Sequence, residues 1–491
     1  MQLVRWIRSV ELSSKRLCIV LALCVVAVIT ASAQTFTTLV SFNTTDGNEP
    51  GYVALIQGTD GAFYGTTISG GRFLSGTVFR VTADGELTTL YSFCAETNCA
   101  DGMSPFAGVT LAGDGNFYGT TDKGGILESC CGTVFKLSPH GELTTLYSFC
   151  TDTGYAGCRG EPDTVTSLLQ ASSGSFYGTT GEGVCGAYNS FNSLCSTVFT
   201  ITSDGVFTTL HPFPDFQGET ANPSSLIQAA DTTLYGTTSI GGGSSHCAGG
   251  CGTIFKMSVN GDFEVVHAFD VSDGCSPNSG LIQAFDGNFY GTAGCGANSA
   301  GTVFRLSGDG KSLTTIYAFC SQPNCKDGAY PNALIQGSDG NFYGTTEAGY
   351  STYGALYRLT LDGKFTTLHT FQYTDGSSPW SLLQGTNGKF YGTTSSGGAY
   401  RAGTVFSLDV GLSPFVALER YFGRVGQTGG IFGQGFTGTT GVELNRRPAN
   451  FTVVSDTYIR ATVPAGATSG YLTVTTPSGT LRSNRPFQVI R

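Results

Sequence analysis

A unit of 48 to 59 residues repeats along most of the chain, and this repetition constrains the fold more than any other feature. The string Phe63-Tyr64-Gly65-Thr66-Thr67 recurs, with small changes, from Phe117, Phe176, Leu234, Phe289, Phe342 and Phe390. Three other strings accompany it in the first unit: Ala54-Leu55-Ile56-Gln57, Gly76-Thr77-Val78-Phe79 and Thr88-Thr89-Leu90-Tyr91-Ser92-Phe93. Each is rich in aromatic and β-branched residues and is bounded by turn residues, which predicts a strand. Four strands per unit predict the blade of a β-propeller.

The third of these strings, Thr88–Phe93, is displaced in one unit. The last unit ends at Leu408 without it, and a spare copy stands at residues 37–42, before the first unit. We therefore predict seven blades over residues 34–410, with the N-terminal strand 35–43 lying beside 403–408 as the outer strand of the last blade. Such closure removes the open sheet edges that favour aggregation.

The connections between strands fall into two classes. From Gln57 to Phe63 and from Phe79 to Leu90 the lengths are nearly constant between units, as in tight hairpins with Asp-Gly turns. The other two connections vary in length. Alternate connections of a four-stranded meander lie on the same face, so we predict one face of constant hairpins and one of variable loops.

The N-terminus has the pattern of an export signal over residues 1–33, with cleavage between Ala33 and Gln34. Its apolar run, Leu17–Ile29, is short for a membrane span, although an uncleaved anchor is an alternative. Removing the leader changes the net charge from −10 to −13, because four positive charges and one negative charge are lost. We expect an exported bacterial protein, extracellular, periplasmic or on the cell surface. It should be a monomer that has no transmembrane segment after cleavage and does not bind nucleic acid.

Fourteen cysteines lie outside the leader, and in an exported chain an even number predicts disulfide bonds. Most lie in the variable loops. The predicted pairs are Cys94–Cys99, Cys150–Cys158, Cys185–Cys195, Cys247–Cys251, Cys275–Cys295 and Cys320–Cys325. Cys130 and Cys131 are adjacent, and their pairing stays open. A zinc site fits these spacings poorly, and no metal site is assigned to the cysteines.

After Gly411 the repeats stop, and short alternating strands with turns predict a small β-sandwich over residues 411–491. Strings such as Gly430-Ile431-Phe432-Gly433-Gln434-Gly435-Phe436 resemble the IPT/TIG family, which implies an immunoglobulin-like fold. The recurrent Phe-Tyr-Gly-Thr-Thr, Gly-Thr-Val-Phe and Thr-Thr-Leu-Tyr-Ser-Phe strings resemble the choice-of-anchor tandem repeat (GloVer-type) family of exported bacterial proteins. That resemblance implies a surface or secreted role and brings no catalytic residues.

Five units begin with Asp-Gly-x-x-Pro, at Asp46, Asp101, Asp273, Asp327 and Asp375. These carboxylates on the variable-loop face could hold a polyhydroxylated ligand or Ca²⁺, and no other cofactor is expected. In the alternative interpretation each Asp caps a turn through its own backbone, while Gly and Pro fix the loop.

Two hypotheses for function follow, because a propeller fold by itself does not define one. The first is a non-enzymatic extracellular or cell-surface binding or scaffold protein that engages glycan or protein through its variable loops. The second is a carbohydrate-active or lyase-type propeller enzyme. Its candidate acids, Glu161, Asp163, Glu182, Glu219 and Glu347, follow no repeat pattern, and His246 is the one candidate His. We assign no catalytic residue and expect the chain not to be an enzyme.

Overall fold

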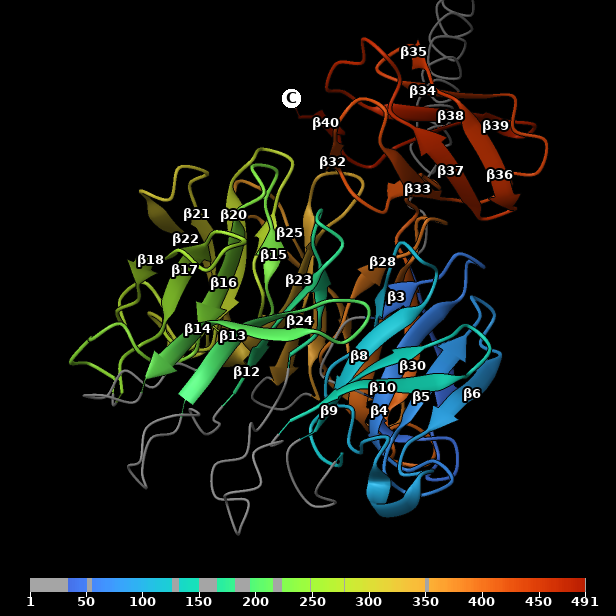
Figure 1. Ribbon diagram of the computed structural model, residues 1–491. Helices are drawn as coiled ribbons and strands as arrows, with labels where there is room; N and C mark the ends of the chain where they lie inside the picture. Colours follow the sequence, from blue (N-terminus) through green and yellow to red (C-terminus); the bar gives the residue numbers. More distant parts are fainter. Residues whose placement is uncertain are drawn as a thin grey trace, which may run out of the picture.

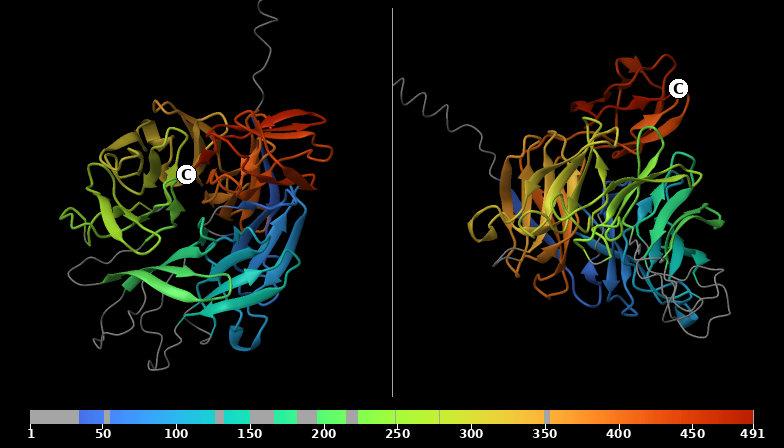
Figure 2. Two further views of the ribbon diagram at one scale, coloured as in Figure 1. Left: turned by 45° about the horizontal axis from the view of Figure 1, so that its top comes forward. Right: turned by 90° about the vertical axis from the view of Figure 1, so that its left-hand side faces the viewer.

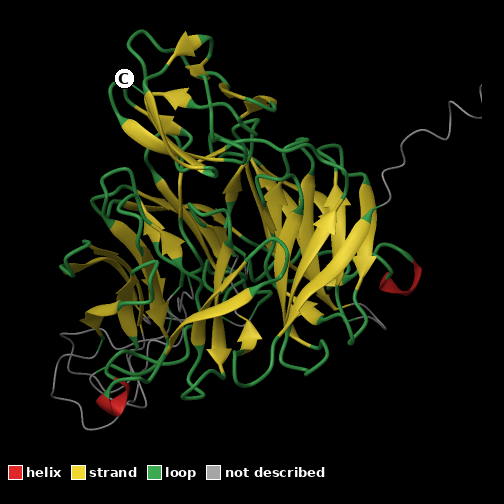
Figure 3. Ribbon diagram, turned by 90° about the vertical axis from the view of Figure 1, so that its right-hand side faces the viewer, coloured by secondary structure: helices red, strands yellow, loops and turns green. Residues whose placement is uncertain are grey.

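The computed structural model describes residues 34–50, 55–125, 132–149, 166–181, 195–214, 223–247, 249–277, 279–348 and 353–490. Within these ranges the protein is built from strands, with two short 3₁₀ turns, η1 (Thr97–Cys99) and η2 (Pro323–Cys325) (Figure 3). None of the helical segments described here could cross a membrane. The expected leader, residues 1–33, lies outside the described ranges.

Seven antiparallel sheets cover the repeat region among the described residues, one for each sequence unit. The first comprises β2 (Asn48–Pro50), β3 (Ile56–Gln57), β4 (Phe63–Ser69), β5 (Thr77–Val81) and β6 (Leu87–Ser92). The second comprises β7 (Thr110–Leu111), β8 (Phe117–Thr121), β9 (Thr133–Leu137) and β10 (Leu143–Ser148). The third comprises β11 (Leu169–Gln170), β12 (Phe176–Thr180), β13 (Cys195–Ile201) and β14 (Phe207–Pro214). The fourth comprises β15 (Ile227–Gln228), β16 (Leu234–Thr238), β17 (Thr253–Met257) and β18 (Phe263–Ala268).

The remaining three sheets continue the same pattern. The fifth comprises β19 (Ile282–Gln283), β20 (Phe289–Ala293), β21 (Thr302–Leu306) and β22 (Leu313–Ala318). The sixth comprises β23 (Ala329–Gln336), β24 (Phe342–Ala348), β25 (Ala355–Leu359) and β26 (Phe365–Thr370). The seventh comprises β27 (Ser377–Pro379), β28 (Leu383–Gln384), β29 (Phe390–Ser396), β30 (Thr404–Asp409) and β1 (Thr35–Ser41). The sheets stand side by side around a centre, as in a β-propeller (Figures 1 and 2).

The N-terminal strand completes the last sheet. β1 pairs antiparallel with β30, with Thr35 opposite Asp409 and Ser41 opposite Thr404. This is the pairing that the displaced copy of the Thr-Thr-Leu string predicts. The two ends of the repeat region are thereby joined in one sheet, so no outer strand is missing from the seventh unit.

The Phe-Tyr pair that opens the second strand of each sheet joins neighbouring sheets. Successive residues of a strand point to opposite faces, so Phe faces the preceding sheet and Tyr the following one. Tyr64 packs on Phe117 with ring centroids 4.4 Å apart, and Tyr391 of the last sheet stacks on Phe63 of the first at 3.9 Å. Equivalent contacts join Tyr118–Phe176, Tyr235–Phe289, Tyr290–Phe342 and Tyr343–Phe390. Between the third and fourth sheets Leu234 takes the place of Phe beside Tyr177.

A second series of aromatic contacts lies farther out and joins all seven sheets. The last Phe of each Thr-Thr-Leu string meets the Phe of the next Gly-Thr-Val-Phe string, edge to face, with centroids 5.0 to 6.0 Å apart. The pairs are Phe42–Phe79, Phe93–Phe135, Phe149–Phe199, Phe213–Phe255, Phe269–Phe304, Phe319–Tyr357 and Phe371–Phe406. The glycine after each Phe-Tyr pair makes room for this ring: a Cβ on Gly65 would lie 2.7 Å from the Phe79 ring.

Residues 417–489 form a separate group of strands beside the seven sheets. One sheet has the order β31 (Ala417–Leu418), β33 (Thr428–Phe432), β37 (Tyr458–Thr462), β36 (Phe451–Ser455). A second has the order β35 (Arg447–Pro448), β34 (Gly441–Leu444), β38 (Leu472–Thr476), β39 (Gly479–Arg482), and β32 (Phe422–Gly423) pairs parallel with β40 (Gln488–Val489). Both four-stranded sheets share one hydrophobic core. The immunoglobulin-like assignment and the boundary near residue 411 remain predictions.

The C-terminal strands sit on the face built from the constant hairpins, which we call the hairpin face. Four of its turns, at Thr59, Gly113, Ser172 and Thr386, contact the C-terminal region. Thr457 Oγ1 donates to the Thr59 carbonyl at 2.6 Å and Arg460 donates to that of Gly113 at 3.1 Å. Arg420 donates to the Ser172 carbonyl, and Thr386 Oγ1 to that of Gly433. Figure 1 shows these strands above the end where β3, β15 and β28 lie. The opposite face, built from the variable loops, is called the loop face.

One aromatic position breaks the repeat pattern and yields a stability prediction. Tyr357 occupies the place of Phe79, and its fully buried hydroxyl finds no hydrogen-bond partner among the described residues. Because an unpaired buried hydroxyl is destabilising, Tyr357→Phe should raise the free energy of unfolding by about 1 kcal/mol. The reverse change at the equivalent place, Phe304→Tyr, should lower it by a similar amount or more. Urea unfolding of both variants measures this, and a loss of stability in Tyr357→Phe would contradict it.

Candidate binding face

The five predicted Asp residues lie in the loops that lead from one sheet to the next, on the loop face. Each carboxylate accepts a hydrogen bond from the backbone N–H that opens its own loop. The donors are Asn43 for Asp46 (2.8 Å), Glu96 for Asp101 (3.2 Å), Asp270 for Asp273 (2.8 Å), Gln322 for Asp327 (3.3 Å) and Gln372 for Asp375 (2.8 Å). This geometry corresponds to the turn-capping interpretation of the sequence.

Four of these carboxylates have a second partner that the sequence analysis missed, on the outer strand of the preceding sheet. Tyr91 and Tyr317 donate their hydroxyls to Asp101 and Asp327, both at 2.8 Å. His267 and His369 take the same place, with Nε2 3.0 Å from Asp273 and Asp375. The sequence contains a regular spacing that could have indicated these pairs. Ten residues separate each Tyr from its Asp, and six residues separate each His from its Asp. Burial raises the pKa of Tyr317 to about 12, so its hydroxyl remains a donor at neutral pH.

Exposure separates these five residues further. Asp101 and Asp327 are fully buried, so neither can contact a ligand in this conformation. Asp46 has Val40 at the position of the Tyr or His partner, and its second oxygen accepts from the side chain of Asn43 at 2.6 Å. Burial raises the pKa of Asp46. The carboxylates therefore form hydrogen bonds within their own loops. Ligand contact stays a prediction, and only Asp46, Asp273 and Asp375 are exposed enough for it.

The rest of the Asp-Gly-x-x-Pro motif links each loop to the preceding sheet. The residue before Pro has a positive φ in all five loops: Glu49, Ser104, Ser276, Tyr330 and Ser378. Its N–H donates across the sheet boundary, for example from Ser378 to the Tyr353 carbonyl at 2.9 Å. Gly354 belongs to the preceding sheet, and a Cβ on it would lie 2.3 Å from the Pro379 ring. A glycine at this position therefore allows the Pro of the motif to pack closely against that sheet. These five backbone links fix the loop face from sheet to sheet.

Disulfide bonds stiffen several of these loops. Cys94–Cys99 and Cys320–Cys325 close the segments that contain η1 and η2, directly before Asp101 and Asp327. Cys247–Cys251 and Cys275–Cys295 close loops of the fourth and fifth sheets. These are four of the pairs expected from the sequence. The predicted pairs Cys150–Cys158 and Cys185–Cys195, and the adjacent Cys130 and Cys131, involve side chains outside the described part of the chain.

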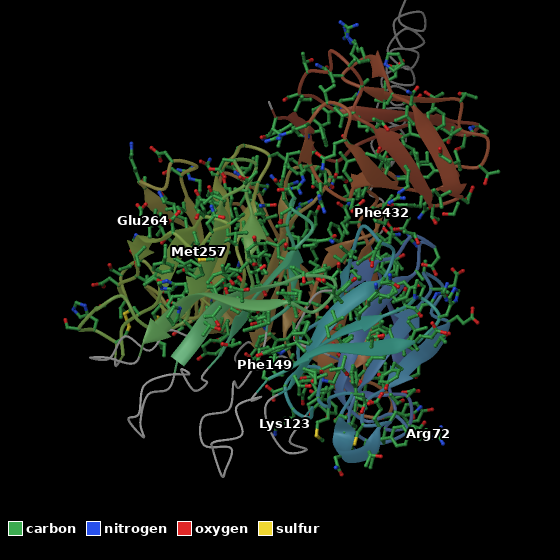
Figure 4. All side chains as sticks on the ribbon, in the orientation of Figure 1. Arg72, Lys123, Phe149, Met257, Glu264 and Phe432 are labelled. Atoms are coloured by element: carbon green, nitrogen blue, oxygen red, sulfur yellow. A yellow bond between two sulfur atoms is a disulfide. The ribbon has the colours of Figure 1, made fainter. Side chains whose placement is uncertain are left out.

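Exposed aromatic side chains in the described residues belong to three neighbouring sheets. In the described ranges five aromatic residues are exposed, between 37% and 66%: Phe73, Tyr330, Tyr353, Tyr373 and Tyr400. Phe73, Tyr353, Tyr373 and Tyr400 lie in loops, and Tyr330 lies near the start of β23. They belong to the sixth, seventh and first sheets, which are neighbours because β1 closes the ring. Figure 4 places Arg72, which precedes Phe73 in the sequence, at the end of the propeller away from Phe432 and the C-terminal strands. We call these five residues the aromatic patch; no sequence pattern identified it.

Backbone contacts hold the aromatic patch in place. Tyr400 and Phe73 lie at equivalent points of two loops, Gly397–Gly403 and Gly70–Gly76, each closed by a parallel bridge at its base. The Tyr373 carbonyl accepts from Gly398 N–H at 2.9 Å, which ties two of the loops together. The rings of Tyr353 and Tyr373 lie 5.3 Å apart. These contacts pre-organise the patch, which lowers the ordering entropy lost on binding.

The described titratable groups of the loop face form no cluster that suggests a metal site. Among the described residues no group of three or more His, Cys, Asp and Glu side chains could hold a metal ion. His246 lies 3.1 Å from Asp270, and both side chains are exposed. His211, like His267 and His369, packs on the outer strand, where its ring stacks on Phe263 at 4.0 Å and burial lowers its pKa. Of the five scattered acids named as candidates, Glu347 alone lies within the described ranges.

Comparison with known proteins identifies the family. The model of the Gloeobacter/Verrucomicrobia repeat matches residues 24–161, 160–325 and 301–441, so the chain belongs to this repeat family. No curated protein matches the sequence.

Among solved structures, similarity is structural only. Oligogalacturonate lyase from Vibrio parahaemolyticus is 10% identical over 77% of this chain and 94% of its own, with a TM-score of 0.49. PorZ, a surface component of the type-IX secretion system of Porphyromonas gingivalis, is 14% identical over 92% and 61%, with a TM-score of 0.47. The periplasmic gluconolactonase of Pseudomonas aeruginosa is 15% identical over 69% and 93%, with a TM-score of 0.43.

The contacts of Asp327 predict that it stabilises the fold. Asp327→Ala would leave the N–H groups of Ser321 and Gln322 without their acceptor and the Tyr317 hydroxyl with only Ser321 Oγ as a partner. We expect the free energy of unfolding to fall by about 3 kcal/mol. Asp84→Ala, at an exposed hairpin turn where the carboxylate forms no hydrogen bond within the described residues, is the control and should change it by less than about 0.5 kcal/mol. Equal unfolding midpoints for the two variants in urea would show that Asp327 has no such role.

Proposed function

We propose that this member of the Gloeobacter/Verrucomicrobia repeat family is an exported binding protein that engages an extracellular glycan through the loop face of its propeller. The observation that carries the proposal is the aromatic patch. Large aromatic side chains left in solvent on a rigid surface are typical of interaction sites. Tyrosine combines an apolar ring with a hydroxyl, so it can stack on the C–H face of a sugar and also form a hydrogen bond.

The position of the patch supports the proposal. The C-terminal strands cover part of the hairpin face through contacts with four of its turns, whereas the loop face carries the patch and the disulfide-closed loops. Variable loops on a rigid scaffold are the usual place for binding residues. The Asp-Gly-x-x-Pro links hold those loops in place. In this proposal the predicted Asp residues therefore contribute by fixing the conformation of the binding face.

A protein partner is the alternative occupant, since tyrosine-rich surfaces also bind proteins. An enzyme of the carbohydrate-active or lyase type is the second alternative. It would need an acid and a base set at the distance that its reaction requires. The exposed His246–Asp270 pair lies on the same face, but belongs to the fourth sheet, away from the loops that carry the patch.

The test is a glycan array probed with residues 34–491, followed by titration of the best glycan. Tyr400→Ala and Tyr373→Ala should each weaken binding roughly tenfold, because each removes a stacking surface worth about 1 kcal/mol or more. Val206→Ala changes an exposed apolar residue in a hairpin turn of the other face and should leave the affinity unchanged.

Three outcomes would contradict the proposal. The first is an array on which no glycan binds. The second is binding that survives both Tyr variants but is lost in Val206→Ala. The third is release of a shorter or unsaturated sugar during the titration, detected by mass spectrometry, which would indicate an enzyme.

A further inference from the structure

A cavity of about 550 Å³ lies between the hairpin face and the C-terminal strands. On the propeller side it is lined by the first strands of the third, fourth and fifth sheets and the turns that follow them, including Gln170, Gln228 and Gln283. On the C-terminal side it is lined by Arg420, Tyr421 and Arg485. Volumes of this order are typical of sites for small organic ligands.

The three glutamines belong to a series of links that joins neighbouring hairpins, and one link of the series is open. Gln57 accepts from Thr386 N–H, Gln170 from Gly113, Gln228 from Ser172, Gln336 from Phe285 and Gln384 from Ser338, all at 2.8 to 3.1 Å. In each link the donor N–H stands two residues after the equivalent position of the neighbouring sheet. For Gln283 that donor would be Ala230, two residues after Gln228. The amide of Gln283 donates to Gly287 at 3.3 Å, but no hydrogen bond joins its Oε1 to Ala230 in the described structure.

The open link lies at the cavity. Both Ala230 and Gln283 line it, so an acceptor and a backbone donor that are paired in five other places are left without each other there. Both residues are half-buried, and Gln283 is not among the buried side chains that lack a partner, so both groups are accessible to a ligand in the cavity.

Two arginines face the same space without an acidic partner. Neither Arg420 nor Arg485 forms an ion pair within the described residues. Arg485 lies over the Tyr421 ring, 3.3 Å from its centroid, and burial lowers the pKa of its guanidinium. Arg420 donates to the Ser172 carbonyl at 3.5 Å. A guanidinium presents several donors in one plane, a geometry that matches a carboxylate.

Two carboxylates also line the cavity, but both are engaged. Asp286 accepts from Asn288 N–H at 3.0 Å, from its side-chain amide at 2.8 Å and from the Tyr290 hydroxyl at 2.9 Å. Glu419 accepts from Gly430 N–H at 3.0 Å. Neither carboxylate forms an ion pair with Arg420 or Arg485 in the described residues, so the arginines keep free donors for a ligand.

We propose that this cavity binds an acidic sugar, whose carboxylate pairs with Arg420 and Arg485 and whose hydroxyls complete the open link between Ala230 and Gln283. The cavity is larger than an inorganic anion requires, and its polar groups away from the arginines suit hydroxyls. Tyr421 and Phe422 supply aromatic wall for the sugar ring. The site lies on the hairpin face and is independent of the aromatic patch.

The proposal is tested by calorimetric titration of residues 34–491 with D-glucuronate, with D-glucose as the neutral counterpart. Glucuronate should bind and glucose should bind at least roughly tenfold more weakly, because glucose lacks the group that pairs with the arginines. Gln283→Leu and Arg420→Gln should each weaken glucuronate binding roughly tenfold. Folding should tolerate Gln283→Leu, because Leu111 already occupies the equivalent place in the second sheet.

Two control variants separate this site from others. Gln384→Leu breaks an equivalent link, to Ser338, and neither of these residues lines the cavity; Val206→Ala changes an exposed apolar residue of another hairpin. Both should leave glucuronate affinity within about twofold. Equal affinity for glucose, equal affinity for inorganic phosphate, absence of glucuronate binding, or unchanged affinity in Gln283→Leu and Arg420→Gln would each overturn the assignment.

Discussion

The contact between Tyr of one sheet and Phe of the next is the interaction on which the rest of the structure depends. Each sheet is small, and in four of the seven the first strand is only two residues long: β7, β11, β15 and β19. Such a sheet cannot bury both faces without its neighbours. Because Phe and Tyr are consecutive, one dipeptide supplies the contact to both neighbours, and the outer Phe pairs repeat the arrangement at a larger radius. Aromatic pairs of this geometry contribute beyond the area that they bury.

This packing also separates the two faces of the molecule. The buried aromatic rings fix the sheets, so the connections on either face are free to differ in length without changing the core. On the hairpin face the turns are constant, linked by glutamines and partly covered by the C-terminal strands. On the loop face each Asp-Gly-x-x-Pro segment is tied to the preceding sheet. A rigid framework with variable segments on one side is well suited to binding.

Much of the fold could be predicted because the repeat makes it redundant. The string Phe-Tyr-Gly-Thr-Thr occurs with a recognisable pattern in every unit, and the displaced copy at residues 37–42 identified the partner of β30. The role of Asp101 and Asp327 was harder, since their Tyr partners lie in the preceding repeat and become neighbours only when the sheets pack. The same holds for Gln57 and its equivalents, which the sequence marked as strand residues but whose bonds cross a sheet boundary.

The aromatic patch and the cavity could not be predicted, for a different reason. Phe73, Tyr353 and Tyr400 look like ordinary loop residues in the sequence, and they belong to neighbouring sheets only because the closed ring places the first, sixth and seventh sheets together. The cavity depends on where the C-terminal strands sit, which is decided by contacts such as that of Thr457 with Thr59, almost 400 residues apart in sequence. No local pattern records such a contact.

The central claim is that Tyr–Phe contacts between sheets hold the ring closed. Its most direct test is a double-mutant cycle on the closing pair, using Phe63→Leu, Tyr391→Leu and both together, with unfolding followed in urea. We expect a coupling energy of about 0.5 to 1.5 kcal/mol beyond the sum of lost burial. Strictly additive effects of the two changes would contradict the account, because each ring would then stabilise its own sheet without contributing to closure.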